Sequence, residues 1–543
     1  MDLLEMSQNT LLLTFFIQFP LTLEAGNILI PSDSIHSNSN LTDSVNLIAV
    51  TSTSAGNIDS IPSLSINDAP LNFFKESLYE DSILYARPPK KRFWRALGEG
   101  VFVNTVVWSA DRWILGKDYY SKGWSTLKDN WKKGWSWDGD AFSTNFIDHP
   151  YHGNLYFTGA RASGCDFWMS SLLTALGSVE WEEIAETDFP SHNDLLSTTF
   201  GGAALGEVTM RLTDIILNNR SRGLRRVLKE TLAFGIAPMR GINRMIDGDM
   251  WRHDETHYLY HDKSEIPYSI FLSAGCRWAD TKASSTTTNP SLNIRIDYGK
   301  FGSVKHNKPF DCFVSEMTFN KNTSHIPLVS KFCINGRLHG WQIHKGEKSG
   351  SVFSINQDFE YYNNEQQESF KGDRLTLLSL TEPAALGPAF SFESSAFRHV
   401  TNANIVFLGG YTSDYYYRDY NMGSGFNVKL NNALRISDFL YFNFDTSFHY
   451  LFTWKGYEKD LIRKYKSEGK EEPYELKGLF RKAGDQAYAT FFIINPRIDI
   501  KIFKNLYASA QYHYFTRCSV YKYFDNANSH YSDFNLSITY KIE

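Results

Sequence analysis

Two histidines three positions apart are the first residues in this chain that could carry chemistry. His149 and His152 flank Pro150, and Asp138 and Asp140 lie shortly before them. Imidazole and carboxylate groups at such spacing can ligate zinc, but the segment lacks the second tight ligand pair of most zinc sites. A cluster of hydrogen-bonded histidines is the alternative interpretation. We therefore predict no bound metal and no cofactor.

The same region could serve an acyl hydrolase that acts on lipids or glycolipids. His152 would be the general base, and Ser191 or Ser170 the nucleophile. Asn154 or Asp194 would orient the imidazole. The sequence contains no GxSxG motif, the usual setting of a hydrolase serine, and Ser191 with Asp194 three residues later is also a helix-capping box. The catalytic candidates are His149, His152, Asn154, Ser191 and Asp194.

A second polar group lies on an expected helix. Glu207, Arg211 and Asp214 follow one another at i, i+4 and i+7, so they form one polar stripe on an otherwise apolar helix. Such a stripe needs a polar partner or a wet cavity, and Arg161 is included as a fourth member. An internal ion-pair network is the usual meaning of such a stripe. A path for a polar solute is the alternative.

The segment that carries all these candidates has helical periodicity. The capping box at Ser191 predicts a helix that runs to about Asn218. A second helix begins near Ser221, and Pro238 must kink or end it. We therefore predict a mainly helical module over residues 95–260.

From about Tyr268 onward the hydrophobic period changes to two. In residues 497–502 (RIDIKI) every second residue is isoleucine and every other one is charged, a pattern that only a strand can place on two faces. We count about 12 such segments, and an even number suits a closed barrel. The sequence therefore predicts an α+β fold. A transmembrane antiparallel β-barrel over residues 265–543 carries the helical module packed in or beneath its lumen.

The aromatic content favours a membrane barrel. Aromatic residues make up 15% of the chain, with 40 Phe, 30 Tyr and 13 Trp. The tyrosines gather near expected strand ends, where membrane barrels carry an aromatic girdle. A soluble secreted β-sandwich, which has the same period, is the alternative. The mean hydropathy is −0.35, and no interior run approaches the roughly 18 apolar residues of a spanning helix, which excludes a helical membrane protein.

The first 94 residues are expected to comprise a signal peptide, a linker and a short helical segment. Residues 10–23 are apolar and precede a plausible cleavage site after Ala25, so residues 1–25 are typical of a secretory signal peptide. Residues 26–70 are rich in Ser, Asn, Thr and Asp, which predicts a disordered linker. Residues 71–94 show helical spacing and predict a short helical segment.

The five cysteines show no metal-binding spacing. Their odd number leaves at least one thiol unpaired. Cys312 and Cys333 could face each other across a hairpin, but directly paired strand positions often give strained bridges. Free or buried thiols are the simpler interpretation.

The helical segment also resembles a known family. It contains Trp135-Ser136-Trp137-Asp138, then HPYHGNLYF at residues 149–157, and further on Gly201-Gly202 with Gly206-Glu207. From Trp135 to Asp249 these runs resemble the domain of unknown function 3943 family, bacterial envelope proteins common in Bacteroides-like organisms. The resemblance implies the Gram-negative cell envelope and supplies no established activity.

We predict an outer-membrane protein that is exported through the periplasm. Its activity is unknown, and a plugged barrel with a structural, binding or restricted solute-passage role fits the sequence best. A membrane-embedded lipid- or glycolipid-modifying enzyme and a secreted β-sandwich are the alternatives, so enzymatic activity stays open. The expected partners are outer-membrane lipid, the barrel-insertion machinery, and a small solute or glycolipid. The net charge of −5 gives no sign of a nucleic-acid partner.

Overall fold

The computed structural model describes twelve stretches of the chain. They are residues 91–114, 124–137, 142–186, 189–219, 221–253, 266–280, 287–321, 328–368, 374–413, 420–453, 486–522 and 525–543. The predicted signal peptide, the linker and residues 71–90 of the predicted short helical segment lie outside these ranges, as do Asp138 and Asp140.

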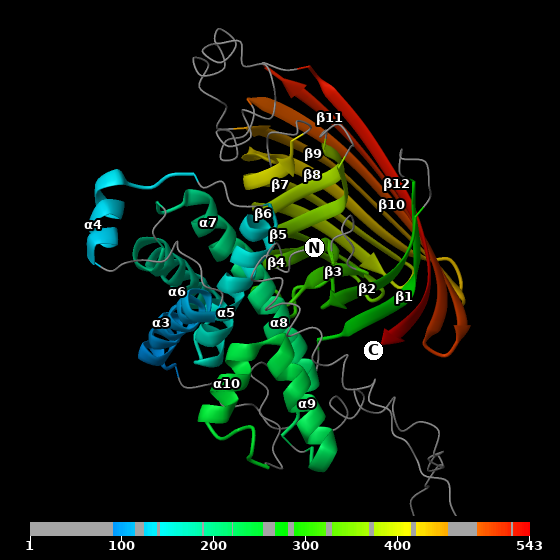
Figure 1. Ribbon diagram of the computed structural model, residues 1–543. Helices are drawn as coiled ribbons and strands as arrows, with labels where there is room; N and C mark the ends of the chain where they lie inside the picture. The colour runs from blue at the N-terminus through cyan, green and yellow to red at the C-terminus, as the bar shows by residue number, and fades with distance from the viewer. Residues whose placement is uncertain are drawn as a thin grey trace, which may run out of the picture.

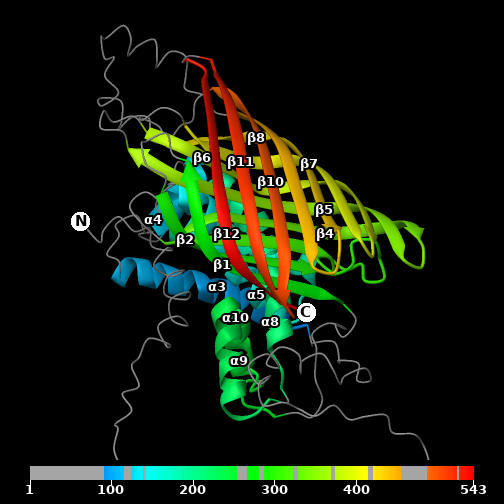
Figure 2. The ribbon, with the colours of Figure 1, turned by 90° about the vertical axis from the view of Figure 1, so that its right-hand side faces the viewer.

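Twelve antiparallel strands close into a barrel (Figure 1), which confirms the fold predicted from the sequence. The strands are β1 (Tyr268–Asp280), β2 (Thr287–Tyr298), β3 (Phe313–Asn320), β4 (Val329–Lys345), β5 (Ser349–Glu368), β6 (Arg374–Ser394), β7 (Phe397–Thr412), β8 (Tyr420–Arg435), β9 (Leu440–Thr453), β10 (Ala487–Phe503), β11 (Leu506–Tyr521) and β12 (Ala527–Ile542). The last strand pairs with the first, with Ile542 opposite Ile270 (Figure 2).

The two ends of the barrel differ in their connections. Residues 346–348, 395–396 and 504–505 join strands at the end where β12 terminates, which we call the short-turn end. At the opposite end, residues 454–486 separate β9 from β10. Residues 299–312, which join β2 to β3, are an exception to the short connections at the short-turn end. Short turns at one end are usual in outer-membrane barrels.

The helices precede the barrel in the chain, and four of them contain a π-helical segment (η). They are α3 (Phe93–Ser109) with η2 (Ala110–Ile114), α4 (Trp124–Lys133), η3 (Thr144–Asp148) with α5 (His149–Ala162), α6 (Phe167–Glu180) with η4 (Trp181–Ala185), α7 (His192–Leu196) with η5 (Ser197–Gly201) and α8 (Gly202–Ile216), α9 (Gly223–Ile236) and α10 (Pro238–Ile246). No helix in the described ranges combines the length and apolar character needed to cross a membrane.

The local signals for these helices are confirmed. Ser191 is the N-cap of α7, and its hydroxyl accepts a hydrogen bond of 3.3 Å from the backbone N–H of Asp194. Helix α9 ends before Pro238, which starts α10 because proline lacks the N–H group that a helix interior requires. Capping and helix breaking are local events, so the sequence reveals them directly.

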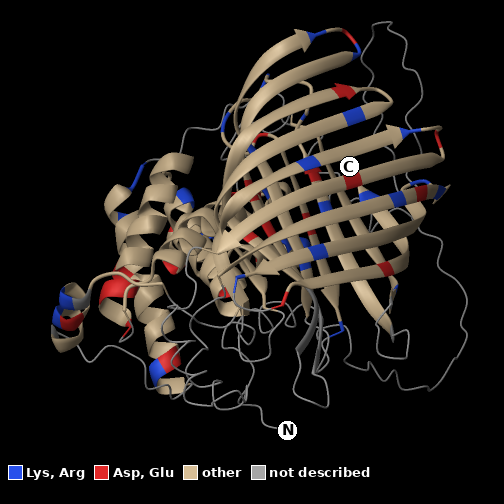
Figure 3. Ribbon diagram, turned by 90° about the horizontal axis from the view of Figure 1, so that it is seen from above, with Lys and Arg blue, Asp and Glu red and all other residues tan. Residues whose placement is uncertain are grey.

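The strand faces follow the predicted alternation, with charged side chains inside the barrel. Arg295 on β2 reaches Asp445 on β9, and Arg398 on β7 reaches Asp297 on β2, so these ion pairs run across the lumen. Acidic and basic positions lie on neighbouring strands around the barrel (Figure 3). The alternate side chains point outward, and large apolar ones such as Phe492 are exposed.

The helical module packs against the outer wall of the barrel, which corrects the expectation that it lies in or beneath the lumen (Figures 1 and 3). On β5, Phe359 and Tyr361 alternate with the luminal Asp358 and Glu360, so they point outward. They are nevertheless only 1% and 2% exposed, because they belong to a cluster of buried residues that includes Phe142 of the module. The lumen is filled by the side chains of the strands themselves, so the module lies outside it.

Candidate functional site

The two predicted histidines lie one turn apart on α5 and have different partners. His149 Nε2 is 3.4 Å from Asp194 Oδ1, and its Nδ1 is 3.4 Å from the hydroxyl of Thr198. His152 Nε2 is 2.9 Å from the hydroxyl of Tyr156. The structure therefore brings Asp194 to His149, whereas the sequence had suggested Asp194 as a partner of His152.

His152 is partly buried among aromatic rings. Its ring packs edge-on against Trp181, with ring centroids 4.9 Å apart. Burial, with a smaller contribution from the neighbouring His149, lowers the pKa of His152 to about 3. Burial also raises the pKa of Tyr156 well above its usual value. Both groups are therefore neutral near pH 7, so His152 is a weak base there.

Ser191 has a structural role beside this cluster. Its hydroxyl donates to Asn193 Oδ1 at 2.7 Å, and its backbone N–H donates to Glu182 Oε2 at 2.9 Å. Asn193 in turn donates to Asp194 Oδ1 at 2.8 Å. These bonds fix the start of α7 against η4, and they give the hydroxyl of Ser191 a partner other than an imidazole.

Asn154 and Ser170 point to other parts of the module. Asn154 Oδ1 accepts a bond of 2.9 Å from the hydroxyl of Thr209 on α8, and Ser170 is fully buried on α6. Sequence reasoning missed Tyr156 and Thr198, although each lies four residues after a predicted candidate, His152 and Asp194 respectively. That helical spacing was the available signal.

Close helix packing positions the cluster. A Cβ added to Gly202 on α8 would lie 2.5 Å from the carbonyl carbon of Gly153 on α5, so only glycine fits at this crossing. The segment η5, which carries Thr198, immediately precedes Gly202 and lies against α5. Single π-helical turns inside α-helices often mark functional sites.

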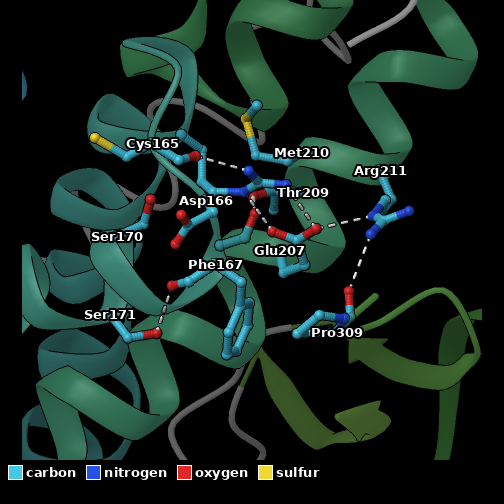
Figure 4. Close-up of polar contacts among 12 residues, drawn as sticks. Cys165, Asp166, Phe167, Ser170, Ser171, Glu207, Thr209, Met210, Arg211 and Pro309 are labelled. Carbon is cyan, nitrogen blue, oxygen red and sulfur yellow. Dashed lines mark hydrogen bonds and ion pairs between the residues drawn. The ribbon is translucent and has the colours of Figure 1, made fainter. Parts of the chain in front are cut away.

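The predicted polar stripe is an ion-pair network that reaches the barrel (Figure 4). The carboxylate of Glu207 accepts from Arg161 Nε at 2.7 Å and from Arg211 Nε at 2.9 Å. Arg211 also donates to Asp311 Oδ1 at 2.8 Å and to the carbonyl of Pro309 at 3.0 Å, both in the loop between β2 and β3. The stripe therefore bridges the helical module to the barrel.

Asp214, the last member of the predicted stripe, belongs to a separate pair. Its carboxylate accepts from Arg240 on α10, and both side chains are buried. Arg240 also donates to the backbone carbonyl of Met210 at 2.9 Å. The sequence could not identify Arg240 because the partner comes from a different helix, 26 residues away.

The lumen of the barrel begins as an open vestibule at the short-turn end. This cavity has a volume of about 840 Å³, and its lining includes Asp297, Arg398 and Asp499. Arg295 and Arg398 both bind the carboxylate of Asp297, at 3.0 and 2.7 Å. A second cavity in the lumen, lined in part by Arg295, Arg398 and Lys331, has only about 90 Å³.

Apolar and aromatic side chains fill another part of the lumen. They form one buried cluster. The cluster includes, from seven strands, Tyr362, Leu380, Val406, Tyr411, Leu451, Phe491, Ile493, Phe515 and Tyr531. The charged pairs and this cluster together occupy the lumen, so the described strands close the barrel with their own side chains.

One luminal group has the donor atoms of a metal site. Atoms of Glu360, Glu382 and His449 lie within 4.8 Å of one another, and all three residues are buried. However, His449 Nδ1 is 2.8 Å from Glu382, and the ammonium of Lys429 is 2.6 Å from Glu360. Lys429 already supplies a positive charge at this position, so these residues are joined in an ion-pair network.

The cysteines of this region are free. Cys333 lines the smaller luminal cavity, and Cys312 is buried in the loop between β2 and β3. The possible bridge between them is therefore not formed.

The comparisons with solved structures give outer-membrane proteins at low identity. OmpT of Vibrio cholerae is 5% identical, covers 51% of this chain and 97% of its own, and has a TM-score of 0.23. The NanC porin is 8% identical over 50% and 100% of the two chains, with a TM-score of 0.23. An outer membrane channel from Pseudomonas putida F1 is 9% identical over 51% and 94%, with a TM-score of 0.22.

No curated protein matches the chain. A family model does match the helical part, over residues 134–239, which confirms the resemblance seen in the sequence. Residues 134–239, from the segment before η3 to the start of α10, therefore match the family described as Domain of unknown function (DUF3943).

Proposed function

We propose that the protein is an outer-membrane β-barrel that holds its helical module in the cell envelope and whose lumen admits small solutes at most. The filled lumen is the observation that carries this proposal. The smaller luminal cavity, of about 90 Å³, has room for only a few water molecules, and Phe491, Phe515 and Tyr531 are packed together in another part of the lumen.

The outer surface of the strands supports a membrane location. Along β10 the outward residues Phe492, Ile498 and Ile500 are exposed and apolar, while Arg497 and Asp499 between them point inward and are buried. A water-soluble barrel would present the opposite pattern, because exposed apolar area is unfavourable in water. Outer-membrane lipid would cover this surface, and the barrel-insertion machinery would place it there.

Conductance measurements test the closed lumen. The purified full-length protein, reconstituted into planar bilayers, should show no open-porin conductance, and the double variant Phe491→Gly, Phe515→Gly should show larger and more frequent channel steps. Large, stable steps from the unmodified protein would contradict the proposal. Fractionation with outer membranes and heat-modifiable migration on a gel should accompany this result. Recovery in the soluble fraction would instead support a secreted protein.

A lipid- or glycolipid-modifying activity is the second candidate, because one set of three side chains in contact favours it. Asp194, His149 and Thr198 lie in the order carboxylate, imidazole, hydroxyl, with 3.4 Å at each contact. This is the order of groups that activates a hydroxyl nucleophile. The variants His149→Gln and Thr198→Val should then change the lipid profile of the membrane without unfolding the protein. An unchanged profile in both would exclude this candidate.

A further inference from the structure

We infer that the helical module is itself in contact with lipid, through a face formed by α3 and α6 that meets the acyl chains of the bilayer that surrounds the barrel. This inference rests on the proposed outer-membrane location. We call this surface the α3–α6 face. Its exposed side chains are Trp94, Val101, Phe102, Val106, Trp168, Leu172 and Leu176.

The module lies at the level of the lipid-facing part of the barrel. Phe359, which the module covers, is ten residues from Ser349 at the short-turn end of β5. Phe492, which is 43% exposed on the outside of β10, is eleven residues from Phe503 at the same end. At about 3.3 Å per residue, Phe359 and Phe492 each lie roughly 35 Å along the strand from the short-turn end. A bilayer that reaches Phe492 therefore also reaches the module.

Helix α6 is apolar on its exposed side, while its buried side carries polar as well as apolar residues. Trp168 and Leu172, four residues apart, are 60% and 53% exposed. Ser170 and Thr174, also four apart, are completely buried. A surface helix in water shows the reverse arrangement, with polar residues outward. The orientation of α6 therefore fits apolar surroundings.

Helix α3 extends the same face. It packs beside α6, where Asn104 donates to the carbonyl of Gly177 at 3.1 Å. Phe102 and Val106, one turn apart, are exposed, whereas Glu99 is buried. Glu99 is the only charged residue between positions 96 and 110, and α6 has none between positions 167 and 179. The two helices together thus present a continuous uncharged surface.

The interior of the module has the features of helices packed in an apolar medium. Glycines allow close approach, as at Gly153 and Gly202, and side-chain hydrogen bonds such as that between Asn154 and Thr209 join the helices. Small residues and polar contacts between helices are typical where lipid removes the hydrophobic drive for association. Exposed apolar patches of several side chains mark membrane or protein contacts, and the shared level with Phe492 favours lipid.

Spin-label accessibility tests the inference on the full-length protein in phospholipid vesicles. In a Cys276→Ser, Cys518→Ser background, labels would be placed at Leu172→Cys on the α3–α6 face, at Phe492→Cys on the barrel, and at Lys128→Cys on the exposed side of α4. Leu172 should behave like Phe492, with high accessibility to oxygen and low accessibility to a water-soluble nickel chelate. Lys128 should show the opposite. Heat-modifiable migration on a gel would verify that each labelled variant folds. If Leu172→Cys does not fold, Leu176→Cys would take its place.

The outcomes separate the inference from the proposed function. If Phe492 is in lipid but Leu172 and Leu176 are reached by the nickel chelate, the inference is wrong and the outer-membrane barrel stands. If Phe492 is itself reached by the chelate, the proposed function fails. Spin–spin broadening between labels at Leu172 would show that a second copy covers the face, which also overturns the inference.

Discussion

Arg211 on α8 and Asp311 in the loop between β2 and β3 form an ion pair of 2.8 Å that joins the helical module to the barrel. Both side chains are buried, and the guanidinium of Arg211 lies 5.7 Å from the ring centre of Tyr298. Glu207 binds the same guanidinium from the module side. Because the two charges have little access to water, the attraction between them offsets the hydration that each loses on burial.

Removing Arg211 should loosen the module from the barrel. The variant Arg211→Met leaves Asp311 and Glu207 buried without this cation, and breaking such a buried pair costs about 3–5 kcal/mol. Urea unfolding followed by tryptophan fluorescence would measure the loss. The exposed Lys128→Met on α4 is the matched control and should change stability by less than about 0.5 kcal/mol. Equal midpoints for the two variants would contradict this role of Arg211.

The glycine contact between α5 and α8 should not tolerate a methyl group. In Gly202→Ala the new Cβ would lie 2.5 Å from backbone atoms of Gly153, so the helices must separate and the stability must fall. Gly100→Ala on α3 meets nothing within 4 Å. That control should gain about 0.5–1 kcal/mol, since alanine loses less backbone entropy in a helix. The two urea midpoints should therefore move in opposite directions.

The cost of a charge on the outside of β10 should depend on depth. Ile498→Arg places a cation near the middle of the outward apolar run of β10, which extends from Phe492 to Ile502, and should cost about 2–4 kcal/mol. Tyr488→Arg, close to the long-loop end of the same strand, should cost about 0–1 kcal/mol. Reversible unfolding in lipid vesicles would give both values. A similar cost at both positions would argue against a bilayer around β10.

Acid should destabilise the module through His152. The folded pKa of about 3 lies below the unfolded value of about 6.5, so the unfolded chain binds more protons between these two pH values. Stability should therefore fall as the pH drops from about 6.5 toward 3, by at most about 1.4 kcal/mol per pH unit. His152→Gln should reduce this dependence, whereas His344→Gln at an exposed site should leave it intact. Unfolding midpoints at pH 7 and pH 4 provide the comparison.

The sequence by itself determined the local elements and the class of fold. The alternation in residues 497–502 allowed only a strand, and repetition of that pattern predicted the twelve-strand barrel. Ser191 and Pro238 marked helix boundaries for reasons confined to a few neighbouring residues. The runs from Trp135 onward predicted the family match over residues 134–239. In each case the physical cause lies within a short stretch of backbone.

The tertiary structure decided where the module lies and which polar groups meet. Phe359 and Phe492 occupy equivalent outward positions on their strands, yet one is buried by helices and the other is exposed. Nothing in the alternation separates these cases, because a strand face is apolar whether protein or lipid covers it. Likewise, His149 meets Asp194, and Arg211 meets Asp311 100 residues away, only when helices and loops have packed. Long-range packing fixes these partners, and the local spacing of residues in the sequence does not reveal them.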